Sequence, residues 1–135
     1  MERSCETHVE LEVPFHDVDP LGVVWHGNYY KYLEHARTAL LRARGLDKGD
    51  LIGVKYRFYV IESRCRHSAP LRYGDRMRVT AWIRDVRHRV LVQYEVTNLS
   101  DGKRAARATT ALATVDAENN LLLETPDEIQ RRLQE

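Results

Sequence analysis

The chain has 135 residues, of which 43% are hydrophobic and 30% charged, and its 21 basic and 20 acidic side chains leave a formal charge of +1. This length suits one core, so we expect a single domain over residues 1–135. The near-neutral charge argues against a nucleic-acid partner, and we find neither a signal-peptide core nor an apolar run near the roughly 20 residues that cross a bilayer. We therefore expect a soluble, cytoplasmic protein without an integral membrane segment.

The cysteine content and the short catalytic motifs exclude several classes of protein. Cys5 and Cys65 are too few for a disulfide framework, and no paired Cys-x-x-Cys motifs indicate a zinc site. The sequence also lacks GxGxxG, GxxxxGK[ST], HExxH and GxSxG. The commonest dinucleotide-binding, P-loop, zinc-protease and serine-hydrolase functions are therefore not expected.

The first part of the chain predicts one strand and one long helix. Alternating polar and apolar residues indicate a half-buried strand over 7–13, which Pro14 ends. After a loop, apolar residues three and four positions apart predict a helix over 28–44, with Gly45 as its stop signal. The apolar stripe of this helix consists of Tyr29, Leu33, Ala36, Leu40 and Ala43.

The rest of the chain predicts four strands and a short last helix. Period-two patterns cover 54–60 with an extension to His67, then 77–83, 90–96 and 104–115. The segment 98–102 has the composition of a hairpin turn between the last two strands. The final helix is expected to begin with Thr125 as N-cap, Pro126 at its first position and Glu128 completing a capping box.

This order of elements predicts an α+β fold. Strands joined by tight connections pair antiparallel, and the single long helix must be covered by the sheet that they form. One helix cannot cover both faces and the edges of such a sheet. We therefore expect a homo-oligomer, formed by edge pairing or by face packing.

The loop between the first strand and the long helix carries the residues best suited to chemistry. Gly22 and Gly27 allow the backbone to approach a ligand closely. The loop leads into a helix N-terminus, where unpaired N–H groups and the helix dipole favour negative charge. A carboxylate just upstream could attack a carbonyl, or activate water to attack it, while those N–H groups hold the oxyanion. The polar side chains of the loop are His16, Asp17, Asp19 and His26.

The same residues allow plainer interpretations. Asp-x-Asp-Pro before a helix is also ordinary turn and capping chemistry. A metal site built from these carboxylates and imidazoles would follow no established ligand spacing, so we expect no metal. A His–Asp pair acting in general acid–base catalysis is a third option.

The stretch HDVDPLGVVWHGNY at 16–29 resembles the signature of the 4-hydroxybenzoyl-CoA thioesterase family, and most closely its Tol–Pal-associated bacterial acyl-CoA thioesterases. The family pattern is approximately D-x-D-x-x-G-[IV]-V-[YW]-x-x-x-Y, followed by a helix that often carries E-x-A-R, which is EHAR at 34–37 here. The resemblance implies the hot-dog fold, an antiparallel sheet wrapped around one long central helix. It also implies hydrolysis of an acyl-CoA thioester to a carboxylic acid and free CoA, with no cofactor beyond the CoA of the substrate.

The resemblance implies specific roles for five residues. Asp19 matches the catalytic carboxylate, as nucleophile or general base, and His26 holds the position whose backbone N–H polarises the thioester carbonyl. Glu34 matches a helix carboxylate that reaches the acyl pocket in some members and only supports the fold in others. Arg87 and Arg89 match a basic segment that contacts CoA in some relatives, although a solvated turn would have the same composition.

Three further expectations complete this interpretation. Asp17 is expected to shape the loop as a hydrogen-bond acceptor, and His67 to be a surface or structural residue. The expected partners are acyl-CoA and a second copy of the chain, as a dimer or a tetramer of dimers, with an acyl-carrier protein as a further candidate. The alternative functions are a non-catalytic module that binds acyl-CoA or acyl-carrier protein, and a 3-hydroxyacyl-thioester dehydratase.

Overall fold

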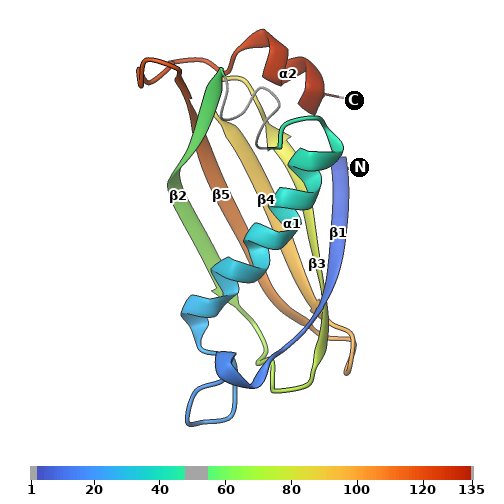
Figure 1. Ribbon diagram of the computed structural model, residues 1–135. Coiled ribbons are helices and arrows are strands. Elements are labelled where there is room, and N and C mark those ends of the chain that lie inside the picture. Colours follow the sequence, from blue (N-terminus) through green and yellow to red (C-terminus); the bar gives the residue numbers. More distant parts are fainter. Residues whose placement is uncertain (1–2, 48–54, 135) are drawn as a thin grey trace.

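The computed structural model describes residues 3–47 and 55–134 and contains a five-stranded antiparallel sheet with the strand order β1-β3-β4-β5-β2. The long helix α1 lies diagonally across one face of this sheet, and the curved sheet wraps around it (Figure 1). This arrangement confirms the expected hot-dog fold. The elements are β1 (Ser4–Glu12), α1 (Tyr29–Ala43), β2 (Tyr56–His67), β3 (Arg76–Asp85), β4 (Val90–Asn98), β5 (Arg104–Asp116) and α2 (Asp127–Leu133), with short 3-10 turns at Phe15–Asp17 and His26–Asn28.

Helix α1 buries one apolar face against the sheet, mainly against β1 and β3. Four residues of the predicted stripe are buried: Tyr29, Leu33, Ala36 and Leu40. Ala43 is exposed instead, because the helix ends there and Leu46 folds back to close the core. Gly45 has a φ of +68°, and the Leu46 N–H donates to the Leu41 carbonyl over 2.8 Å, which is the Schellman ending expected of a C-terminal glycine. No helix in the described ranges is long and apolar enough to span a membrane.

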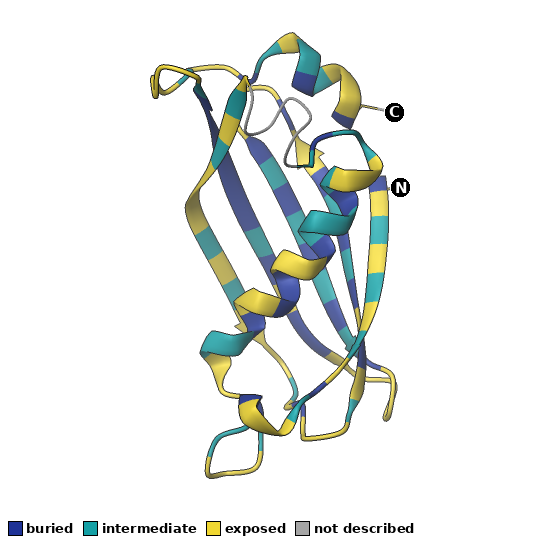
Figure 2. Cartoon of the chain, in the orientation of Figure 1, coloured by how far each residue is buried: buried dark blue, intermediate teal, exposed yellow. Residues whose placement is uncertain are grey.

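The sheet has one buried face and one polar face. Residues of β4 alternate between buried and half-buried positions, and from Arg76 to Ile83 those of β3 alternate between buried positions and exposed or half-buried ones (Figure 2). On the polar face the Arg3 guanidinium lies 3.8 Å from the centre of the Trp82 ring, and Glu95 lies within 3.5 Å of Arg104. The α1 side of the sheet therefore holds the core.

Strand β2 forms one edge of the sheet and is mostly exposed along its length (Figure 2). Its register against β5 shifts between Val60 and Glu62, where a bulge leaves Ile61 without a cross-strand partner. Tyr59, Val60 and Ile61 are all exposed, with 47%, 51% and 55% of their surface accessible. Val54, which the sequence placed at the start of this strand, lies outside the described residues.

The predicted capping box of α2 is wrong. Pro126 has extended backbone angles and is itself the N-cap, so the spacing of the box is displaced by one residue. Thr125 is buried, and its Oγ1 has no hydrogen-bond partner among the described residues. Glu128 turns instead to β2, where its Oε1 accepts hydrogen bonds from Lys55 Nζ at 2.6 Å and from the Tyr56 hydroxyl at 3.3 Å. A contact with a strand distant in the sequence has replaced the local cap.

Candidate active site

The Asp19 carboxylate lies in a tight turn between β1 and α1. The Asp19 N–H donates to the Val23 carbonyl at 2.8 Å, and the Gly22 N–H donates back to the Asp19 carbonyl at 2.9 Å. Gly22 has a φ of +82°, which a residue with a side chain rarely adopts. Asp19 Oδ1 accepts the Leu21 N–H at 2.9 Å, whereas its Oδ2 accepts no hydrogen bond from the described residues. The turn thus holds Asp19 half-buried with one carboxylate oxygen available.

Asp17 fixes this turn to the start of α1, as the sequence predicted. Its buried carboxylate accepts a hydrogen bond from Lys31 Nζ through Oδ1 and one from the Tyr32 hydroxyl through Oδ2, both at 2.6 Å. Its carbonyl oxygen accepts the Asn28 side-chain amide at 2.9 Å and the Trp25 N–H at 3.1 Å. Four donors therefore hold one residue, and the loop cannot move relative to the helix without breaking them.

The Asp17 carboxylate is ionised although it is buried. Burial raises its pKa, but the hydrogen bonds from Lys31 and Tyr32 and the charge of Lys31 outweigh that effect and hold the pKa below the ordinary value of 3.8. Burial of the ring, and then the hydrogen bond to Asp17, raise the pKa of Tyr32 far above its usual range, so Tyr32 remains a donor.

The backbone at the start of α1 offers free N–H groups. Helix α1 follows directly from the 3-10 turn His26–Asn28, and the Asn28 side chain bonds Asp17 instead of capping the helix. The N–H groups of His26 and Gly27 donate to no group in the described part of the chain. A side chain at Gly27 would overlap the Trp25 indole ring, which lies against this turn. The turn thus has the two properties of an oxyanion site, free donors and a helix N-terminus behind them.

A cavity of about 360 Å³ lies between this turn and the end of β2. It brings together two residues that the sequence assigned to catalysis, Asp19 and His26. The loop that leads into α1 and the end of β2, which both supply lining residues, lie at the lower end of the sheet in Figure 1. Within residues 3–47 and 55–134, no three His, Cys, Asp or Glu side chains are grouped to hold a metal. The lining residues are Asp19, Val23, Val24, His26, Tyr29, His67, Ser68, Ala69 and Pro70.

His67 lines the same cavity, although from sequence it is expected to be a surface or structural residue. It is the last residue of β2, and its ring centre is 4.5 Å from that of Tyr29 and 6.4 Å from that of His26. The signal for this placement was present in the sequence. The alternation along β2 puts His67 on the same side as Cys65, the side that faces α1, but nothing local indicated what the imidazole would meet there.

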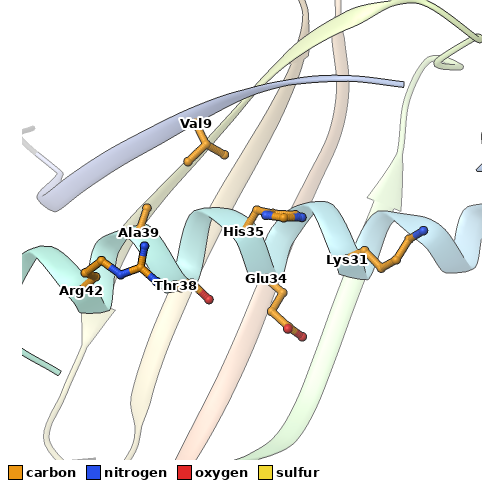
Figure 3. Close-up of a pocket in the computed structure, with 7 residues that line it drawn as sticks. All are labelled: Val9, Lys31, Glu34, His35, Thr38, Ala39 and Arg42. Atoms are coloured by element: carbon orange, nitrogen blue, oxygen red, sulfur yellow. The ribbon is translucent and has the colours of Figure 1, made fainter. Parts of the chain in front are cut away.

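Glu34 lies away from the Asp19 cavity. Its side chain is 69% exposed on the outer surface of α1, 3.7 Å from Arg37. It borders a cavity of about 590 Å³ between α1 and β1, where Val9 faces the helix (Figure 3). It also borders a cavity of about 220 Å³ between α1 and β2, lined by Tyr30, Leu33, Arg37, Val60, Ser63 and Thr110. Contact between Glu34 and a substrate at Asp19 would therefore require an acyl group that extends along α1.

Arg87 and Arg89 lie at the opposite end of the sheet from Asp19. They belong to the turn between β3 and β4, where the Arg87 carbonyl accepts the Thr125 N–H at 2.9 Å just before α2. The ten residues of β3 separate this turn from the Asp19 end, a span of about 33 Å at the usual rise of a strand. Within one protomer these arginines and the Asp19 cavity are not brought together.

Comparisons with known proteins agree with the hot-dog fold and with a thioesterase-like superfamily. Residues 13–133 match the family model of the thioesterase-like superfamily. YneP of Bacillus subtilis (strain 168) is 30% identical over 111 residues, which are 82% of this chain and 80% of YneP. The acyl-CoA thioester hydrolase YbgC of Escherichia coli O157:H7 is 30% identical over 82 residues, 61% of each chain.

Solved structures show the same architecture. Slr0204, a 1,4-dihydroxy-2-naphthoyl-CoA thioesterase from Synechocystis, superposes with a TM-score of 0.83 at 23% identity over 95% of both chains. TT1821 from Thermus thermophilus gives a TM-score of 0.84 at 26% identity over 94% of this chain and 96% of its own. With a matching family model over most of its length and a relative that is 30% identical, this chain belongs to the thioesterase-like superfamily.

Proposed function

We propose that this protein is an acyl-CoA thioesterase, which hydrolyses an acyl-CoA thioester to a carboxylic acid and free CoA. The observation that carries the proposal is the cavity in which the Asp19 carboxylate and the free N–H groups at the start of α1 meet. The names of YbgC and Slr0204 support a CoA thioester as the substrate. The motif at 16–37 supports the narrower placement among the 4-hydroxybenzoyl-CoA and Tol–Pal-associated enzymes.

The proposed mechanism needs one carboxylate, one oxyanion donor and water. The thioester carbonyl oxygen accepts the backbone N–H of His26, which stabilises the oxyanion as it develops. Asp19 either attacks the carbonyl carbon or takes a proton from attacking water, through the oxygen that bonds no described residue. The CoA thiolate then leaves. Thiolates are good leaving groups, so the chemistry calls for no cofactor.

We also propose that the active form is a homo-oligomer. The edge strand β2 presents Tyr59, Val60 and Ile61 to solvent next to unpaired backbone groups, which favours pairing with a second copy. In such an assembly Arg87 and Arg89 of one subunit could meet the CoA phosphates at the site of another. Within one protomer the distance along β3 prevents this.

The proposal is tested by measuring thiol release from a panel of acyl-CoAs with the purified protein. The panel contains benzoyl, hydroxybenzoyl, short-chain and long-chain thioesters, so the same experiment narrows the acyl group. Steady release of free CoA from at least one member, at a rate well above the spontaneous rate, is the expected result.

The other outcomes identify the alternatives. Binding of acyl-CoA by calorimetry without any hydrolysis would indicate a non-catalytic module. Hydration of an enoyl-CoA without thiol release would indicate a dehydratase. Hydrolysis of the thioester of an acylated carrier protein, but of none of the acyl-CoAs, would identify acyl-carrier protein as the carrier of the acyl substrate.

A further inference from the structure

His67 is held in a fixed position at the edge of the Asp19 cavity. Its backbone pairs with Ala106 in the β2–β5 register, and the next residue, Ser68, donates its N–H to the Ala105 carbonyl at 2.8 Å. The imidazole meets the Tyr29 ring edge-on, at an interplanar angle of 84°. The sheet and α1 therefore both position this ring, and it lines the cavity together with Asp19 and His26.

The groups around His67 leave its imidazole as a neutral base. Partial burial of the ring, and then the neighbouring His26, lower the pKa of His67 below 6.5. Burial raises the pKa of Tyr29 to about 12, and burial also raises the pKa of the Cys65 thiol, so neither of these two groups is a base at neutral pH. Asp19 and His26 are the other titratable residues that line the cavity, and the proposed function already uses the Asp19 carboxylate and the His26 backbone N–H.

We propose that His67 is a third catalytic residue, the acceptor of the proton that the hydrolytic water loses. This inference rests on the proposed thioesterase function and divides the work between two residues. Asp19 acts as the nucleophile, and His67 acts as the general base in the water step.

Hydrolysis takes place in two steps. In the first, an Asp19 carboxylate oxygen bonds to the carbonyl carbon and the C–S bond breaks, with the electron pair leaving on sulfur as the CoA thiolate. In the second, the oxygen of water bonds to the anhydride carbon while a water proton passes to the His67 imidazole. The bond to Asp19 breaks and restores its carboxylate, and the imidazolium proton passes to the CoA thiolate. The sum is one acyl-CoA and one water giving one carboxylic acid and one CoA thiol.

The test uses His67→Gln, His67→Ala and the matched control His8→Gln, which replaces an exposed histidine on β1. In His67→Gln we expect a burst of about one thiol per site, followed by a steady rate that is lower by about 100-fold or more. The parent should lose steady-state activity as the pH falls below 6.5, and this acid limb should be absent from His67→Gln. Added imidazole should restore part of the rate of His67→Ala, an effect that a structural role would not produce.

Each failure has a separate meaning. A His67→Gln protein whose steady rate and acid limb match those of the parent would overturn the role of His67 and leave the thioesterase function intact. Slow turnover with neither a burst nor rescue by imidazole, in a variant with the unfolding curve of the parent, would also overturn it. A parent that hydrolyses no acyl-CoA in the panel would remove the proposed function and this inference together. His8→Gln should match the parent throughout.

Discussion

Replacing Asp17 with alanine removes the acceptor that ties the Asp19 turn to α1. The Tyr32 hydroxyl then loses its partner in a buried position, which costs about 1–3 kcal/mol. The Lys31 contact adds only about 0.5 kcal/mol, because the Lys31 side chain is 53% exposed and solvent screens the ion pair. We therefore expect Asp17→Ala to lower the free energy of unfolding by about 2–3 kcal/mol.

The assay is urea denaturation followed by circular dichroism. With a slope of about 2 kcal/mol per molar urea, the expected loss moves the midpoint down by about 1–1.5 M. Asp17→Asn keeps an acceptor for Tyr32 but loses the charge beside Lys31, so its loss should be smaller. Glu118→Gln, in the exposed turn after β5, is the control and should leave the midpoint within experimental error.

The pH dependence provides a second check with a defined sign. The pKa of Asp17 is lower in the folded protein than its ordinary value of 3.8, so the ionised carboxylate stabilises the fold above that value. This contribution is lost as the pH falls through the folded pKa. The difference in the free energy of unfolding between the parent and Asp17→Asn should be largest near neutral pH. It should shrink toward zero as the pH falls below 3.8. An Asp17→Ala midpoint equal to that of the parent, or a difference that grows in acid, would refute the role given to this residue.

Three further predictions concern other parts of the fold. Thr125→Val removes a buried hydroxyl that has no partner in the described chain, and it should raise the free energy of unfolding, measured by heat or urea, by up to about 1 kcal/mol. If Thr125 were a working N-cap, the same substitution would lower that free energy by about 1 kcal/mol. Ile61→Lys, on the exposed edge strand β2, should shift the protein toward monomer in light scattering, while Leu123→Lys at another exposed position should not. An unchanged oligomer in Ile61→Lys would exclude pairing through the β2 edge. Burial raises the pKa of the Cys65 thiol, so this thiol should react with iodoacetamide near pH 8 more slowly than free glutathione does. An equal rate would contradict the partial burial of Cys65.

Periodicity predicted most of the architecture. The helix-spaced apolar residues of α1 and the alternating residues of β3 and β4 each have one buried face, so their patterns identify both the element and the side that meets the core. The expected cap of α2 failed for a tertiary reason. Glu128 bonds Lys55, 73 positions away in the sequence, and no local pattern reports a partner so distant.

The site was predictable only where its residues lie close together in the sequence. Asp17 and Asp19 belong to one loop: Asp17 accepts a hydrogen bond from Lys31 at the start of α1, and Asp19 accepts one from the Leu21 N–H within the loop. His67 reaches the same cavity from the far edge of the sheet, through pairing between β2 and β5 that a single sequence does not specify. For Arg87 and Arg89 the composition suggested a phosphate contact, but only the topology shows that these residues are at the other end of β3 from Asp19.

We propose that the Asp19 carboxylate drives hydrolysis of a CoA thioester at the start of α1. The most direct measurement compares kcat/KM for thiol release by the parent, Asp19→Asn and the exposed-turn control Asp101→Asn, on the member of the acyl-CoA panel that the parent hydrolyses fastest. We expect a fall of about 100-fold or more for Asp19→Asn, with an unchanged unfolding midpoint, and no fall for Asp101→Asn. An Asp19→Asn protein that hydrolyses acyl-CoA as fast as the parent would contradict a catalytic role for Asp19.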